Sequence, residues 1–156
     1  MPMVSTEEHA ENRFKRLIPR SQDCTVILLK GHLLIEEQLQ ALVAALVKDS
    51  RPLGDARLTF HQWLCMGRAL APGGTGADIW KFVEQLNQTR NELAHNAEVA
   101  EFDQKVDDLI KFYAEDGFTG SSTARDRAFR LRATLALVCG ILHGMGRATA
   151  ELIKKK

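Results

Sequence analysis

One long segment, from residue 23 to residue 48, most constrains the fold of this chain. Its apolar residues recur at three-, four- and seven-residue intervals, and this spacing places side chains on one face of an α-helix. These residues are Leu28, Ile35, Leu39, Leu42 and Leu46. Pro52 and Gly54 then end the pattern. A helix of about seven turns predicts that the core of the domain is built around this segment.

The rest of the chain adds helical segments rather than strands. Apolar spacing and breaking residues predict further helices over residues 6–18, 59–70, 78–95, 99–113 and 124–152. Thr59 and Gln62 have the Thr-x-x-Gln spacing of a capping box, which marks the start of a helix. Gly140 and Gly144 are four residues apart, so we expect another helix to approach closely there. The sequence predicts an all-α, single-domain helical bundle of about five or six helices.

Length and composition fit one compact domain. The chain has 156 residues, of which 45% are hydrophobic and 26% are charged. We expect an N-terminal tail and short helix over residues 1–22, the helical bundle over 23–152 and a disordered basic tail over 153–156. The formal net charge of +1 gives no global field that attracts polyanions, so any contact with nucleic acid must be local.

Cysteine usage and the N-terminus predict the compartment. The three cysteines are odd in number and widely spaced, and each lies among apolar residues, which indicates reduced, packed thiols rather than a disulfide framework. The N-terminus has no apolar signal segment, and no stretch approaches the roughly 20 apolar residues of a membrane-spanning helix. We therefore expect a cytoplasmic protein without membrane contact.

Polar and charged residues gather at the end of the predicted helix over 78–95, in the segment 90–95 with the sequence RNELAH. On an ideal helix each residue turns by about 100 degrees. Asn87, Asn91 and His95 therefore fall on one narrow stripe, with Arg90 at its border. Because Arg90 and His95 are about 140 degrees apart, one regular helix cannot aim both at a small group. Either the helix ends near Ala94, or a second copy completes the site.

A histidine and an arginine suit the cleavage of an RNA phosphodiester by its own 2'-hydroxyl. Imidazole can take the hydroxyl proton or protonate the leaving oxygen near neutral pH. Guanidinium matches the charge and geometry of the phosphate oxygens. Asn91 could orient the imidazole or hold the phosphate. The alternative is that Arg90 and His95 cap the negative end of the helix dipole.

These residues resemble the HEPN superfamily, whose members are all-helical domains of about this size. The resemblance rests on Arg-Asn-x-x-x-His at the end of an internal helix and on a long Glu-containing helix before it, here Gly31 to Glu36. It covers residues 23 to 152, and its specific part is six residues long. It implies a metal-independent ribonuclease, a toxin or defence effector, that forms a homodimer in which two motifs share one cleft.

The resemblance also assigns roles to single residues. Arg90 and His95 take the catalytic positions and Asn91 the accessory polar position. Glu36 could neutralise or orient Arg90, or it could be a solvated residue. Other members are inactive and serve as binding or regulatory modules, including relatives of the mannitol-operon repressor. The alternative function is therefore a non-catalytic helical module that binds a protein partner or acts as a regulator.

Four arginines lie in the first turns of the last predicted helix, where the helix dipole disfavours cations. They are Arg125, Arg127, Arg130 and Arg132. They could bind RNA phosphates beside the preceding Gly-Ser loop, or form ion pairs on a solvated face, since helical spacing spreads them around the axis. The expected partners are RNA, a second copy of the chain and, for a toxin, an antitoxin protein.

We expect no cofactor and no metal. His61 and Cys65 are four residues apart and share a helix face, but two ligands do not make a zinc site.

Overall fold

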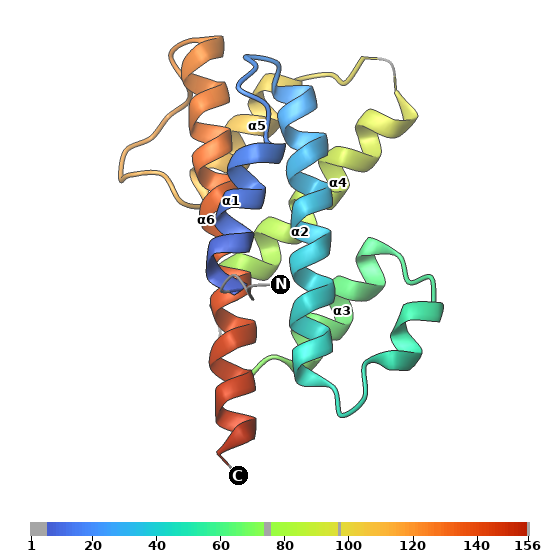
Figure 1. Ribbon diagram of the computed structural model, residues 1–156. Helices are drawn as coiled ribbons and strands as arrows, with labels where there is room; N and C mark the ends of the chain where they lie inside the picture. Colours follow the sequence, from blue (N-terminus) through green and yellow to red (C-terminus); the bar gives the residue numbers. More distant parts are fainter. Residues whose placement is uncertain (1–5, 74–75, 97, 156) are drawn as a thin grey trace.

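The computed structural model describes residues 6–73, 76–96 and 98–155. Within them the chain forms six α-helices and no strand, packed as a single bundle (Figure 1). The helices are α1 (Thr6–Leu17), α2 (Cys24–Leu46), α3 (Phe60–Leu70), α4 (Ala77–His95), α5 (Phe102–Lys111) and α6 (Ala124–Lys154), with a short 3-10 helix η1 (Arg51–Asp55) after α2. The predicted all-α bundle is confirmed.

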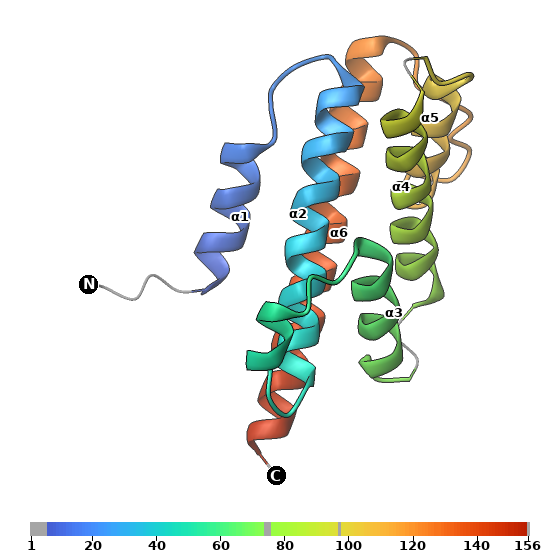
Figure 2. The ribbon, with the colours of Figure 1, turned by 90° about the vertical axis from the view of Figure 1, so that its right-hand side faces the viewer.

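Helices α2 and α6 form the central pair of the bundle and lie side by side in both views (Figures 1 and 2). Gly31 lies against Leu135, and Leu42 lies against Gly146, so the two helices run in the same direction. A Cβ atom added to Gly31 would lie only 2.5 Å from Cδ1 of the buried Leu135. Glycine at this position therefore allows the close approach of the two helices.

The remaining helices lie on two sides of this pair. Figure 2 shows α1 on one side and α4 and α5 on the other, with α3 next to the C-terminal half of α2. The apolar faces of α2, α4, α5 and α6 meet in one core. Its largest fully buried side chains include Phe82, Leu86, Leu109, Leu131, Leu135 and Leu142.

Two helix starts follow from local hydrogen bonds. Asp23 caps α2, since its Oδ1 atom accepts a hydrogen bond of 2.9 Å from the backbone N–H of Thr25. The predicted capping box at α3 is confirmed: the backbone N–H of Thr59 donates to Oε1 of Gln62 at 2.8 Å, and the backbone N–H of Gln62 donates to Oγ1 of Thr59 at 3.3 Å.

Two predicted boundaries were wrong. Helix α5 begins at Phe102 rather than at residue 99, because Glu101 has a left-handed backbone with φ of 58° that a helix cannot include. Helix α6 continues to Lys154, so residues 153 and 154 are helical and not a disordered tail. A cationic residue in the last turn of a helix interacts favourably with its dipole. The predicted tail before residue 6 and Lys156 lie outside the described residues.

Helix α6 also qualifies the expectation about membrane spans. Among the described residues it is the one helix that is long and apolar enough to cross a membrane by length and composition, with a mean hydropathy of 1.3 in its most apolar window. Its inner face packs against α2 as a core helix does. Only 39% of that apolar window is buried, however. Much of its apolar surface therefore faces outward.

The three cysteines are free thiols, as expected, but they are not equally packed. Cys24 is buried and Cys139 is partly buried, whereas Cys65 is exposed on α3. The expectation of a packed thiol was therefore wrong for Cys65, which lies on the solvent side of an amphipathic helix.

Candidate functional site

The Arg-Asn-x-x-x-His segment lies at the C-terminal end of α4, and that end is held firmly. The backbone N–H and the side-chain Nδ2 of Asn96 both donate to the carbonyl oxygen of Glu92, at 3.0 and 3.1 Å. The carboxylate of Glu92 pairs with Nζ of Lys105 on α5 at 3.1 Å. Helix α4 therefore stays regular through His95, its last residue.

The structure brings Arg90 and Asn91 together and leaves His95 apart. Nη1 of Arg90 donates a hydrogen bond of 3.2 Å to Oδ1 of Asn91. Arg90 is half-buried, whereas Asn91 and His95 are exposed. His95 makes no hydrogen bond or ion pair with any described residue. Helix α4 ends at His95, one residue after Ala94. Since His95 is still helical, Arg90 and His95 are about 140 degrees apart around the helix axis.

A buried histidine on α2 contacts the same helix. Nε2 of His32 lies 3.0 Å from Oδ1 of Asn87, one turn before Asn91. Its ring stacks on that of Phe60, with ring centroids 4.1 Å apart and an interplanar angle of 21°. An amide oxygen accepts hydrogen bonds, so this contact requires a proton on Nε2.

Burial lowers the pKa of His32 below its ordinary value of 6.5. The hydrogen bond with Asn87 opposes this change, and the positive charge of Arg90 lowers the pKa further. His32 is therefore neutral at neutral pH. It joins α2 to α4 without adding a second positive charge beside Arg90.

Glu36 does not form an ion pair with Arg90, which was one of the two alternatives left open for it. It is half-buried and makes no hydrogen bond or ion pair within the described part of the chain. The side chain of α2 that reaches α4 is His32, one turn earlier. His32 is buried, and the sequence analysis missed its contact with Asn87. The available signal was spacing: His32 and Glu36 share a helix face, as do Asn87 and Asn91.

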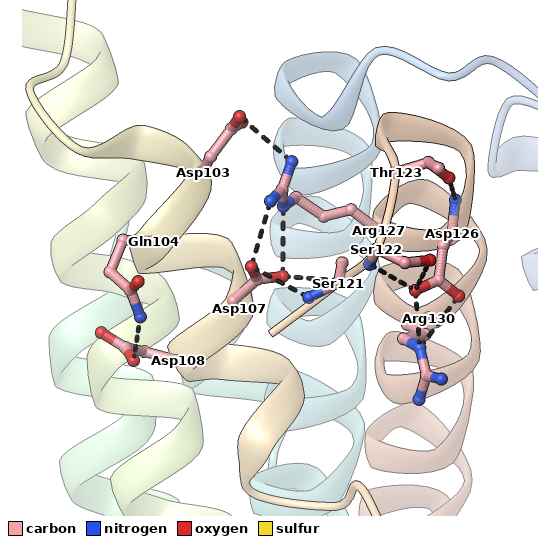
Figure 3. Close-up of polar contacts among 10 residues, drawn as sticks. All are labelled: Asp103, Gln104, Asp107, Asp108, Ser121, Ser122, Thr123, Asp126, Arg127 and Arg130. Atoms are coloured by element: carbon pink, nitrogen blue, oxygen red, sulfur yellow. Dashed lines mark hydrogen bonds and ion pairs between the residues drawn. The ribbon is translucent and has the colours of Figure 1, made fainter. Parts of the chain in front are cut away.

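Arg127 is held in a buried network that joins α5, the following loop and α6 (Figure 3). Its Nε and Nη2 atoms both donate to the carboxylate of Asp107 at 3.1 Å. Asp107 also accepts hydrogen bonds from the hydroxyl of Ser121 at 2.6 Å and from its backbone N–H at 3.2 Å. Burial raises the pKa of Asp107, but the hydrogen bonds and charge of these partners outweigh it, so the pKa lies below its ordinary value.

The other three arginines differ in their surroundings. Arg130 pairs with Asp126 at 2.9 Å and with Glu115 at 3.1 Å. Nη1 of Arg132 donates a hydrogen bond of 2.6 Å to the backbone carbonyl of Ser21. Arg125 is exposed and makes no such contact with a described residue. Internal contacts thus give Arg127, Arg130 and Arg132 a structural reason for their place at the start of α6.

The described residues hold no group of three or more His, Cys, Asp or Glu side chains that could bind a metal ion. Nε2 of His61 and Sγ of Cys65 lie 3.5 Å apart on α3. Among the described residues they have no third potential ligand beside them.

No match to this chain was found among protein-family models, curated proteins or solved structures. The functional argument therefore rests on the residues at the end of α4 and on their surroundings.

Proposed function

We propose that this protein is a metal-independent endoribonuclease of HEPN type, acting as a homodimer and serving as a toxin or defence effector in the cytoplasm. The observation that carries the proposal is the chemistry at the end of α4. A half-buried guanidinium, bonded to Asn91, lies beside the neutral His32, and an exposed imidazole, His95, occupies the last position of the same helix. These groups supply positive charge, hydrogen bonding and proton transfer.

The proposed reaction gives each group a role. Neutral His95 takes the proton of a ribose 2'-hydroxyl, and the hydroxyl oxygen attacks the adjacent phosphorus. The bond from phosphorus to the 5'-oxygen breaks, and that oxygen receives the proton from the His95 imidazolium, which leaves His95 neutral again. The products are a 2',3'-cyclic phosphate and a 5'-hydroxyl end. Arg90 stabilises the negative charge on the phosphate oxygens, and Asn91 positions Arg90 through the observed hydrogen bond.

A second copy of the chain completes the proposed site. Since α4 stays helical through His95, Arg90 and His95 of one copy point in different directions. Three apolar residues of α2 supply a surface for the second copy: Val26, Leu29 and Leu33 are 39%, 38% and 53% exposed. On an ideal helix, Leu29 and Leu33 lie within about 60 degrees of Glu36. Docking at this surface brings two copies together beside the α2–α4 contact.

The test is RNA cleavage in EDTA by purified wild-type protein and by His95→Ala. General acid–base catalysis contributes roughly 10²–10⁴-fold, so we expect cleavage by His95→Ala to fall by at least that lower factor. The matched control is His61→Ala, which removes another exposed histidine on a different helix and should retain activity. Circular dichroism checks the folding of each variant. A folded wild type that does not cleave RNA in EDTA contradicts the proposal.

A second function is supported by a different observation. Helix α6 exposes large apolar side chains, among them Phe129 and Leu137, and the catalytic proposal does not use them. A non-catalytic module that binds a protein partner or acts as a regulator accounts for their exposure. Expression in a host separates the two functions: an active ribonuclease slows growth and His95→Ala relieves the effect, whereas a binding module gives the same growth with either protein.

A further inference from the structure

One side of α6 is exposed over most of its length and consists mainly of small and apolar residues, with one charged residue, Arg147, near its C-terminal end. Its residues, here called the outward face of α6, are Phe129, Ala133, Ala136, Leu137, Gly140, Gly144 and Ala148. They extend over roughly 30 Å of helix. Phe129 is 65% exposed and Leu137 is 46% exposed. A stripe of this kind is what a helix shows when it packs against another helix.

The two glycines of this face do not pack against any described part of the chain. Nothing described lies within 4 Å of a Cβ atom added to Gly140 or Gly144. By contrast, Gly31 and Gly146 lie against Leu135 and Leu42. Glycine destabilises a helix interior relative to alanine. The close approach predicted at Gly140 and Gly144 is therefore not made by any described helix of this chain, and a helix from outside the chain would account for both residues.

A groove runs beside the outward face. It has a volume of about 1240 Å³ and lies between α1 and the α2–α6 pair, where Figure 2 shows α1 beside α2. Phe14, Ile18 and Leu34 contribute apolar walls. Oε1 of Gln38 and Nε2 of His143, both on side chains that line the groove, are buried and have no hydrogen-bond partner in the described residues. Buried polar atoms are nearly always paired, so these two unpaired atoms are unusual features of the side chains that line the groove.

The charge around the groove selects the kind of occupant. Its lining includes four basic residues, Arg13, Lys15, Arg20 and Arg132, and one acidic residue, Glu37. Glu37 is already paired with Arg13 at 2.8 Å. From Arg127 to Ala150 the sequence of α6 has no acidic residue. A second copy would bring the same positive charge to the groove, whereas acidic side chains would complement it.

We propose that the outward face of α6, together with this groove, docks one amphipathic helix of a partner protein. The partner helix has small and apolar residues on its contact face and Asp or Glu on its flanks. A membrane surface fits less well, because helices that lie on membranes bury large apolar side chains rather than alanine and glycine. Helix α1, whose residues Phe14 and Lys15 line the groove, lies on the side of the α2–α6 pair opposite α4 (Figure 2). The proposal therefore does not depend on nuclease activity.

The test uses two labelled helical peptides of about 20 residues, long enough to follow the outward face. Both have alanine and leucine on one face, and their flanks carry either glutamate or lysine. Fluorescence anisotropy measures binding to the wild type, to Gly140→Leu/Gly144→Leu and to the control Ala69→Leu, which enlarges an exposed alanine on α3. We expect the glutamate peptide to bind the wild type at least ten-fold more tightly than the lysine peptide. The double variant should weaken that binding at least ten-fold, and Ala69→Leu should leave it unchanged.

Folding of the double variant is checked by circular dichroism, and Gly140→Ala/Gly144→Ala provides a milder comparison. Since the added methyl groups meet no described atom within 4 Å, the alanine variant should melt at a higher temperature than the wild type. The proposal is overturned if neither peptide binds the wild type, if both peptides bind it equally, or if Gly140→Leu/Gly144→Leu binds the glutamate peptide as tightly as the wild type does. It is also overturned if sedimentation shows that the leucines dissolve a homodimer, or if vesicles of anionic lipid bind wild type and leucine variant alike while neither peptide binds.

Discussion

Nε2 of His32 on α2 lies 3.0 Å from Oδ1 of Asn87 on α4, and Arg90 follows Asn87 by nearly one helical turn. This contact fixes the face that α4 presents to α2. It also places a buried imidazole near a guanidinium, which favours the uncharged form of the imidazole. The stability of the fold and the electrostatics of the candidate site are therefore linked through one titratable side chain.

His32 makes the stability of the protein depend on pH. Burial lowers its pKa in the folded state below the ordinary 6.5, so the unfolded chain binds a proton more readily. The stabilisation is fully present above about pH 6.5 and is lost as the pH falls toward the folded-state pKa. We expect the free energy of unfolding, measured with urea between pH 7 and 5, to decline more steeply for wild type than for His32→Gln. The exposed control His61→Gln should keep the wild-type slope; equal slopes for wild type and His32→Gln would rule out this role.

Among the acidic residues of the α5–α6 network, replacing Asp107 should lower the free energy of unfolding the most. Its side chain is 9% exposed and that of Arg127 is 14% exposed. Asp107→Ala leaves the guanidinium buried without this counterion, which typically costs about 3–5 kcal/mol. Asp103 also pairs with Arg127 but is 72% exposed, so Asp103→Ala should cost at most about 1 kcal/mol. Urea unfolding compares the two variants, and similar losses of stability would contradict the prediction.

The features that were predicted correctly from the sequence depend on residues that are only a few positions apart in the chain. The capping box of Thr59 and Gln62 involves residues three apart, and the helical faces repeat every few residues. The motif was placed correctly at the end of a helix for the same reason. The start of α5 was missed because no sequence signal announced the left-handed backbone of Glu101.

The features that sequence did not predict depend on tertiary contacts. Asp107 and Arg127 are 20 residues apart, and His32 and Asn87 are 55 apart. Helical periodicity shows which face each residue occupies, but not which helix packs against it. The same limit applies to Gly140 and Gly144, whose spacing predicted a close helix although no described helix approaches them closely.

The three thiols should differ in their reactivity. Burial, with a smaller contribution from the charge of Glu37, raises the pKa of Cys139 to about 12, and burial also raises the pKa of Cys24. The thiolate is the reactive form, so both should react slowly with iodoacetamide at pH 8. Cys65 is exposed and should react first. Mass spectrometry of the alkylated protein identifies the site, and Cys65→Ser should remove the fast phase. A fast phase that persists in Cys65→Ser would contradict the assignment.

The proposed dimer can be tested separately from the proposed chemistry by mixing two inactive variants. In a symmetric dimer, each shared site takes Arg90 from one copy and His95 from the other. A dimer of one Arg90→Ala chain and one His95→Ala chain then has one site with both residues intact. Random exchange makes half of the dimers mixed, so an equimolar mixture should recover about a quarter of the wild-type cleavage in EDTA. If each copy forms its own site, every site lacks one residue and the mixture stays as inactive as either variant. Sedimentation of the same mixture shows whether dimers are present. If the mixture contains dimers but does not cleave RNA, a shared site is excluded, and the role of His95 is still judged from the separate comparison of wild type with His95→Ala.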